Sequence, residues 1–359
     1  QMVADSVEMG ASYANDIYYS MENGEVHSVD RNNWDVAFFT SPWSSEILVN
    51  DGAGAELRTY PNADTSSWDA IDTTGLHTWP VLYNDPDNWQ NGAFSRFSTG
   101  HPDYGWGVYN TITHDVVGDS LYILTFADGT AKKVWILKKI STQNTYIFKY
   151  ANLDGSNEVM ETIACGDYTA KNFVYYSMHT GELLDREPAS DTWDILFTKY
   201  VAILENGSPY PVTGVLNNVD VPANKFNEVG SDFDDWSSMP MDSTKSPIGY
   251  DWKYFDMGTF SYVVDDSTAF FVSNKSKDVY KLTFSVFDYM VGKVVFATGL
   301  VSPANIGDVK PLDQFHIYPN PASGSVTLEA IQGVVPEAVT ITDLSGKIVF
   351  RSEQVNSLT

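Results

Sequence analysis

Short runs of β-branched and aromatic residues recur along the chain and are separated by turn residues. Two of these runs extend from Trp34 to Phe39 and from Trp193 to Phe197. A third run, Ser120 to Phe126, is followed by Ala127-Asp128-Gly129-Thr130 and then by Lys133 to Leu137, which predicts a β-hairpin around an Asp-Gly turn. Patterns typical of amphipathic helices are scarce. We therefore expect an all-β fold.

Two sections of the chain resemble each other. Tyr18-Tyr19-Ser20-Met21 recurs as Tyr175-Tyr176-Ser177-Met178, and Trp34-Asp35-Val36-Ala37-Phe38 recurs as Trp193-Asp194-Ile195-Leu196-Phe197. Further matches follow in the same order at a nearly constant spacing, which is typical of an internal duplication. The sequence predicts two homologous β domains, at about residues 11–155 and 166–300.

The regions between the predicted strands differ in composition from the strands themselves. The middle of each repeat, about 51–103 and 205–248, is rich in Gly, Pro, Asp, Asn and Ser. These segments are too long for ordinary connections, so we expect functional loops or short irregular elements there. Residues 302–314 contain two prolines and little periodicity, and they are interpreted as a linker to a separate domain at 315–359.

Charge excludes one broad class of function. Asp and Glu total 47 against 21 Lys and Arg, so the formal net charge is −26. Such a surface repels phosphate backbones, which argues against nucleic-acid binding. A transmembrane helix needs about 18 consecutive apolar residues, and no stretch of this sequence comes close to that length. No leader precedes Gln1, and we interpret the numbering as that of a mature protein.

Cys165 is the single cysteine of the 359-residue chain, so an intramolecular disulfide and a thiolate metal cluster are both excluded. Its neighbours Ile163 and Ala164 favour a buried, unreactive thiol.

The tail carries the most specific motifs. A Tyr318-Pro319-Asn320-Pro321 turn is followed by alternating strand patterns and by Asp343-Leu344-Ser345-Gly346-Lys347. These segments closely resemble the type A C-terminal sorting domain of type IX secretion cargo in Bacteroidota. The resemblance implies a small Ig-like β-sandwich that binds the type IX translocon and its outer-membrane cargo-shuttle protein. The implied sorting residues are Tyr318, Pro319, Asn320, Pro321, Asp343, Gly346 and Lys347.

The same resemblance sets two further expectations. The protein is expected to be exported across the outer membrane and to be secreted or displayed on the cell surface. Members of that family continue for further strands beyond this point, so we expect residues 315–359 to form an incomplete sandwich with an exposed strand edge.

The order of motifs within each repeat points to a second family. In the first repeat the Trp34 run is followed by Tyr104-Gly105-Trp106 and by the Asp128-Gly129 hairpin. This order resembles that of the HmuY-like haemophore family of Bacteroidota, secreted all-β proteins that bind haem. The second repeat departs from the pattern, since Asn274-Lys275-Ser276 replaces the Asp-Gly turn and Asp251 precedes Trp252.

In that family two loop side chains, His or Met, ligate the haem iron from opposite faces. The resemblance makes haem a possible cofactor, and the variable loops offer candidate ligands and flanking aromatic rings. In the first repeat the candidate ligands are His77 and His101, and the candidate flanking rings are Trp79, Trp89 and Trp106. In the second repeat the candidate ligands are Met239, Met241 and Met257.

Asp85 and Asp87 suggest a possible calcium site. The segment from Asp85 to Gly92 has closely spaced oxygen ligands. However, a helical-hand loop requires Gly at its sixth position and Glu at its twelfth, where this chain has Gln90 and Arg96. A solvated turn and an irregular calcium site both stay open, as they do for the cluster Asp232, Asp234 and Asp235.

No pattern singles out an enzyme. The sequence has no Gly-x-Ser-x-Gly elbow, phosphate loop or dinucleotide fingerprint. We expect a non-enzymatic surface structural or adhesion subunit built from HmuY-like domains, because fold alone does not carry ligand chemistry. The alternative is a secreted protein that binds haem or another small ligand.

Overall fold

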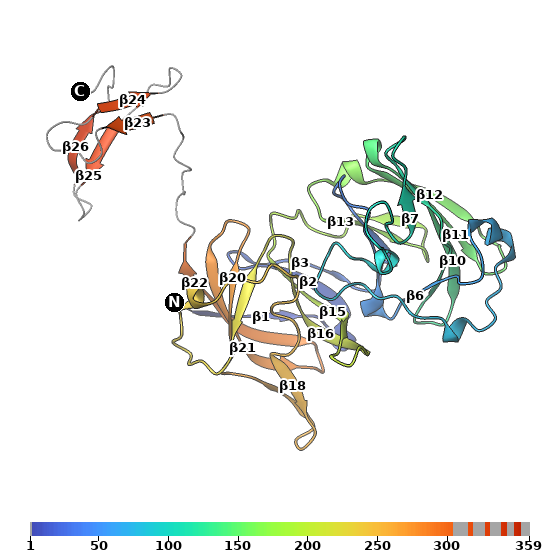
Figure 1. Cartoon of the computed structure of the whole chain (residues 1–359). Helices are drawn as coiled ribbons and strands as arrows, with labels where there is room; N and C mark the ends of the chain where they lie inside the picture. The colour runs from blue at the N-terminus through green and yellow to red at the C-terminus, as the bar shows by residue number, and fades with distance from the viewer. Residues whose placement is uncertain (1, 304–314, 319–326, 331–338, 343–347, 353–359) are drawn as a thin grey trace. The chain divides into compact units, whose positions relative to one another are not determined.

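The computed structural model describes residues 2–303, 315–318, 327–330, 339–342 and 348–352 (Figure 1). The chain divides into a body, Gln1–Pro303, and a tail, Ala304–Thr359, which are described separately. The described residues form β-strands with only short 3-10 helical turns between them. The all-β prediction is therefore confirmed.

The body contains two β-sandwiches, which we call lobe A and lobe B. Lobe A packs a seven-stranded sheet, ordered β12-β11-β10-β8-β7 with β6 and β9 attached, against a four-stranded sheet ordered β14-β13-β4-β5. Its strands are β4 Val36–Phe39, β5 Ile47–Val49, β6 Glu56–Thr59, β7 Gly107–Tyr109, β8 Val116–Gly118, β9 Tyr122–Thr125, β10 Ala131–Ile140, β11 Thr145–Asn152, β12 Val159–Ala164, β13 Phe173–Ser177 and β14 Glu182–Leu184. Strands β9 and β10 form the predicted Asp-Gly hairpin, in which Gly129 adopts φ +82°.

Lobe B packs a five-stranded sheet, ordered β1-β22-β21-β20-β17, against a second four-stranded sheet, ordered β16-β15-β2-β3. Its strands are β1 Val3–Glu8, β2 Asn15–Ser20, β3 Gly24–Asp30, β15 Ile195–Ile203, β16 Pro209–Asn217, β17 Ala223–Phe226, β20 Ala269–Ser273, β21 Val279–Asp288 and β22 Lys293–Ser302. A separate hairpin, β18 Lys253–Asp256 and β19 Ser261–Val264, extends from this lobe (Figure 1).

Each lobe takes strands from both predicted repeats. Strand β2, which carries the first Tyr-Tyr motif, pairs with β15 of the second repeat. Strand β13, which carries the second Tyr-Tyr motif, pairs with β4 of the first repeat. The division at 11–155 and 166–300 stays a prediction about sequence duplication. Each of the two hydrophobic cores contains residues from both of these ranges.

The two tyrosines of each Tyr-Tyr motif face opposite sides of a four-stranded sheet, because side chains alternate along a strand. Tyr19 lies in the core of lobe B and Tyr176 in the core of lobe A. Tyr18 and Tyr175 instead line a cavity between the lobes. Both faces of these strands are therefore buried, which accounts for their nearly continuous apolar sequence.

Trp89 joins the two lobes. It packs against buried clusters on both four-stranded sheets, including Phe173 of lobe A and Leu216 of lobe B. Its indole N–H donates to the carbonyl of Asn217 at 2.8 Å. The shared apolar packing makes the body one compact unit.

The long middle segments contain short irregular elements, as expected. The 3-10 turns of the described residues are η1 Ala11–Tyr13, η2 Asp51–Ala53, η3 Thr65–Ala70, η4 Leu76–Thr78, η5 Ala93–Ser95, η6 Ser141–Gln143, η7 Cys165–Tyr168 and η8 Trp236–Ser238.

Cys165 is buried, and burial raises the pKa of its thiol to about 12. The predicted buried thiol is therefore confirmed.

Two hairpin pairs are described in the tail. Strand β23, Phe315–Tyr318, pairs with β24, Thr327–Ala330, and β25, Val339–Thr342, pairs with β26, Ile348–Ser352. Tyr318 is the last residue of β23. The other implied sorting residues, and most of the predicted linker, lie outside the described residues: Pro319, Asn320, Pro321, Asp343, Gly346, Lys347 and residues 304–314.

Candidate functional site

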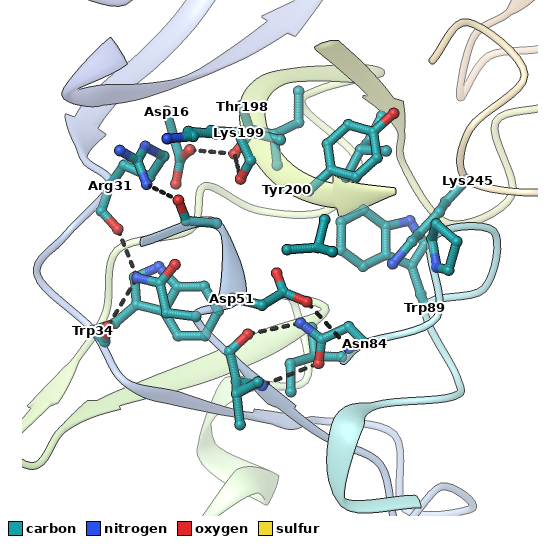
Figure 2. Close-up of a pocket in the computed structure, with 18 of the residues that line it drawn as sticks. Asp16, Arg31, Trp34, Asp51, Asn84, Trp89, Thr198, Lys199, Tyr200 and Lys245 are labelled. Atoms are coloured by element: carbon teal, nitrogen blue, oxygen red, sulfur yellow. Dashed lines mark hydrogen bonds between the residues drawn. The ribbon is translucent and has the colours of Figure 1, made fainter. Parts of the chain in front are cut away.

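A cavity of about 70 Å³ lies between the four-stranded sheets of the two lobes (Figure 2). Its walls combine aromatic rings, such as those of Trp34 and Trp89, with charged side chains from both lobes. The volume exceeds the roughly 10–15 Å³ that one water molecule needs. It is far below the roughly 300–1,000 Å³ of a typical ligand pocket, and therefore of a haem site.

A buried ion pair lies at one end of the cavity. The guanidinium of Arg186, which follows β14, donates to Asp16 of β2 at 2.8 Å, and both side chains are almost fully buried. Asp16 also accepts a hydrogen bond from Thr198 of β15 at 2.6 Å. Because a lone buried charge is costly, removing either member of this pair would leave the other uncompensated.

Asp51 and Lys245 line the same cavity from opposite lobes (Figure 2). Burial raises the pKa of Asp51 to about 6, although Lys245 and the Asn84 N–H favour its charged form. Burial lowers the pKa of Lys245 to about 8, and its ammonium lies 4.7 Å from the centre of the Trp89 ring. Both groups thus have perturbed pKa values.

Perturbed pKa values often mark functional sites, but ion networks inside a fold perturb them as well. Here charged side chains of lobe A and lobe B meet in one cavity, whose volume of about 70 Å³ is enough for a few waters. Arg186 Nε has no hydrogen-bond partner among the described residues, and it lines this cavity. The arrangement stabilises the contact between the lobes and leaves room for bound solvent.

The predicted haem ligands of the first repeat lie on different elements. His77 is exposed in η4. His101 is exposed in the loop before β7, with its ring centre 4.9 Å from that of Tyr109. His101 lines a second cleft together with His114, and His77 is not among the described residues that line this cleft.

The three candidate methionines of the second repeat also have different surroundings. Met239 is partly exposed directly after η8, and Met241 packs against the cluster around Phe226. Met257 is exposed in the turn between β18 and β19. The pairing of any of these residues about a haem iron stays a prediction.

The three aromatic rings proposed to flank a porphyrin all pack within the fold. Trp106 is fully buried in the core of lobe A, and its indole N–H donates to Ser45 O at 2.9 Å. Trp89 lies between the lobes. Trp79 packs at 5.7 Å against Tyr60.

The carboxylates of the possible calcium site already have partners. Asp85 forms an ion pair with Arg96 at 2.9 Å and accepts a hydrogen bond from Asn91. Partial burial acts to raise the pKa of Asp85, but the Asp87 N–H and Arg96 outweigh it, and the pKa is lowered. Asp87 accepts a hydrogen bond from the Ser246 hydroxyl. No group of three or more His, Cys, Asp or Glu side chains suited to a metal was found among the described residues.

The sequence pattern did not predict the charged cavity between the lobes. Its ion pair joins Asp16 to Arg186, which are 170 residues apart. The only local signal is a charged residue within or beside a strongly apolar strand. That signal does not identify a partner.

Among known protein families, one family model matches the tail of the chain. Residues 316–359 match the family model described as "Secretion system C-terminal sorting domain". The chain carries a type IX sorting domain. No curated protein and no solved structure matches the chain.

The sorting domain determines where the protein goes. The protein is exported across the outer membrane and is either displayed on the cell surface or released. Its tail interacts with the type IX secretion machinery. Within the described residues, none of the helices has the length and hydrophobicity needed to cross a membrane.

Proposed function

We propose that the protein is a non-enzymatic structural or adhesion subunit of the cell surface, with a body built from HmuY-like β domains. Delivery to the surface is given by the tail. The observation that carries the proposal is an exposed apolar surface on lobe B. We call this surface the β18–β19 arm. It comprises the hairpin, its turn and the adjacent β21–β22 turn, and its exposed members are Tyr254, Phe255, Met257, Phe260, Tyr289 and Met290.

The arm exposes large side chains that would normally be buried. Met257 is 69% exposed, Phe260 67% and Met290 67%. Tyr262 links the hairpin to the adjacent turn, with its ring centre 5.3 Å from that of Phe255 and 5.8 Å from that of Tyr289. Large apolar side chains on a protein surface are usually scattered singly, so several of them exposed within one hairpin and the neighbouring turn mark a candidate interaction site.

The surroundings of the arm favour a protein partner of a particular chemistry. Asp251 is paired with Lys225 at 2.7 Å. Asp256 and Asp288 are the last residues of β18 and β21, beside the two turns. Their negative charge favours a partner with an apolar patch rimmed by Lys and Arg. It disfavours insertion into an anionic membrane surface. The cavity between the lobes supports no larger ligand, because its volume is about 70 Å³.

The proposal is tested in a strain that lacks the gene. The strain is complemented with the wild-type protein, with Phe255→Ser/Met257→Ser/Phe260→Ser, or with the control Met160→Ser, which changes an exposed side chain on β12 of lobe A. We expect the triple variant to be exported normally but to lose surface attachment or gliding. We expect the control to restore both, and haem-limited growth to be normal throughout.

The haem-binding alternative predicts a different pattern. Growth on limiting haem would then depend on the gene, and the purified protein would give a sharp six-coordinate Soret band with haemin. The band would weaken in His77→Ala and His101→Ala. Attachment that is unchanged by gene deletion, together with that pattern, would replace our proposal with the alternative.

A further inference from the structure

Trp43 is the most exposed large hydrophobic residue in the described part of the body, at 93% of its surface. It lies in the loop between β4 and β5, at the edge of a cleft of about 460 Å³ in lobe A. Tryptophan is strongly enriched among the residues that carry most of the binding energy of interfaces. The loop that carries Trp43 is therefore a candidate for a role in binding.

The loop is held in place by buried groups beneath it. Lys139 is 1% exposed, and its ammonium donates to the carbonyls of Ser41, Pro42 and Ser44. Two further side chains of the core, Tyr146 and Trp106, donate to the carbonyls of Ser44 and Ser45. A buried lysine is expensive unless its hydrogen bonds are satisfied, so the loop and the lysine stabilise each other. Trp43 is thus presented from a preorganised backbone, which reduces the entropy lost on binding.

Besides Trp43, four ring side chains line the cleft: His101, Tyr104, Tyr109 and His114. His101 lies 4.9 Å from Tyr109, and Tyr109 lies 6.1 Å from His114, between ring centres. The Tyr109 hydroxyl and His114 Nδ1 share a hydrogen bond of 2.7 Å, which orients both rings. Tyr104 contributes a further ring. The side chains of His101 and Tyr104 make no hydrogen bond within the described residues, so their polar atoms are available to a ligand.

The cleft lacks the negative charge that dominates the chain. Within the described residues, its lining contains no Asp, Glu, Lys or Arg, although the formal net charge of the chain is −26. Three acidic residues adjacent to lining residues in the sequence have other partners: Glu46 accepts a hydrogen bond from the Gly92 N–H, Asp103 accepts from the N–H groups of Thr99 and Gly105, and Asp115 pairs with Lys138 at 2.6 Å. A neutral ligand fits this cleft better than an ion of either sign.

We propose that this cleft binds a neutral saccharide. A pyranose ring presents apolar C–H faces that pack against indole and phenol rings, and hydroxyl groups that exchange hydrogen bonds with His, Tyr, Ser and Thr. The cleft supplies both kinds of partner, including Ser141 and Thr142 at its rim. The proposal goes beyond surface attachment through the β18–β19 arm, because it uses a different lobe and a different ligand chemistry.

The test is affinity electrophoresis of the purified full-length protein in native gels. The gels contain one of four neutral polysaccharides (dextran, xyloglucan, galactomannan or amylopectin) or one of two anionic ones (polygalacturonate or hyaluronan). We expect at least one neutral polysaccharide to retard the protein and neither anionic one to do so. Trp43→Ala should weaken the interaction by about 10-fold or more. Tyr109→Phe, which removes one hydroxyl and keeps the ring, should weaken it less.

Ile112→Ala is the matched control, because Ile112 is 86% exposed and is not among the described residues that line the cleft. Trp43→Ala should melt at the wild-type temperature, since the indole is almost fully exposed. Retardation by none of the neutral polysaccharides, retardation by the anionic ones alone, or equal retardation of wild type and Trp43→Ala would each overturn the proposal.

Discussion

The carboxylate of Asp35 accepts a hydrogen bond from the backbone N–H of Met178 at 2.6 Å. The same contact occurs in the other lobe, where Asp194 accepts from the Met21 N–H at 2.7 Å. In each case the Trp-Asp motif of one repeat binds the Tyr-Tyr-Ser-Met turn of the other. Each predicted repeat therefore contributes strands to the lobe formed mainly by the other, and the two aspartates bind the turns at the ends of those strands.

Replacing either aspartate should destabilise the body. Asp35 also accepts from the His179 N–H at 3.3 Å, and Asp194 accepts from the Lys275 N–H at 3.0 Å. Alanine would leave two backbone donors without their partner in each lobe: the N–H groups of Met178 and His179 in one turn, and those of Met21 and Lys275 in two different turns. We expect Asp35→Ala and Asp194→Ala each to reduce the free energy of unfolding by about 2–4 kcal/mol, measured by urea denaturation. The exposed control Asp69→Ala should behave like wild type, and three indistinguishable denaturation curves would contradict the assignment.

The sharing of strands between the repeats also predicts how fragments behave. Residues 2–165 lack β13, and residues 166–303 lack β2, so each fragment misses a central strand of one four-stranded sheet. We expect each fragment alone to be unfolded or aggregated. Mixing them should restore a 1:1 complex with the circular dichroism spectrum of the intact body. A cooperative thermal transition in either isolated fragment would show that the repeats fold independently.

At Gly52 the backbone of lobe A lies so close to the backbone of lobe B that there is no room for a side chain. A Cβ atom at this position would lie 1.9 Å from the carbonyl oxygen of Lys199 on the other lobe, and that oxygen belongs to the backbone. We expect Gly52→Ala to force the lobes apart and to cost about 1–3 kcal/mol. Gly166→Ala is the matched control, because its Cβ would lie 3.8 Å from its nearest neighbour, an ordinary contact. Equal melting temperatures for the two variants would refute this tight contact.

Much of the secondary structure follows from the sequence pattern. The alternation of residues and the Asp128-Gly129 turn predict the β9–β10 hairpin, because that turn chemistry is local. The sharing of strands between the repeats does not follow in the same way. Both repeats carry the same Trp-Asp and Tyr-Tyr segments, so pairing within a repeat and pairing between repeats satisfy the same hydrogen bonds.

The binding cleft of lobe A is also difficult to predict from the sequence, because its residues come from distant segments of the chain. His101 could be identified from its loop, but its neighbour His114 becomes significant only when the fold places both beside Tyr109. The exposure of Trp43 could not be predicted either, because it depends on the buried ammonium of Lys139 nearly a hundred residues away in the chain. Chemistry that is distributed over distant segments leaves no local signal.

The lowered pKa of Lys253 should be detectable as a pH dependence of the free energy of unfolding. Burial lowers the pKa of this lysine to about 7 from 10.5, although Asp251 favours its charged form. Between about pH 7 and about 10.5 the unfolded chain holds a proton that the folded protein has released. The free energy of unfolding therefore gains a contribution that rises with pH across this window, and the contribution is lost as pH falls through about 7.

Lys253→Met removes this titration, together with the ammonium that lies 4.2 Å from the centre of the Trp252 ring, and keeps an unbranched apolar side chain. The measurement is the difference in free energy of unfolding between wild type and the variant, from neutral to alkaline pH. We expect wild type to gain stability relative to the variant as pH rises. A difference that stays constant with pH would mean that Lys253 titrates normally in the folded protein.

The tail should be sufficient for export. Because the body and the tail are separate compact units, the sorting signal should work without lobes A and B. We predict that a fluorescent reporter with a signal peptide, fused to the region from residue 304 onward, reaches the cell surface or the medium. The same reporter without that region should stay in the periplasm. In a strain that lacks the type IX translocon, both reporters should stay there, because β23 to β26 would have no machinery to bind. If the fused reporter stays in the periplasm of wild-type cells while the full-length protein is exported, the body must contribute to recognition, and the tail alone would not account for sorting.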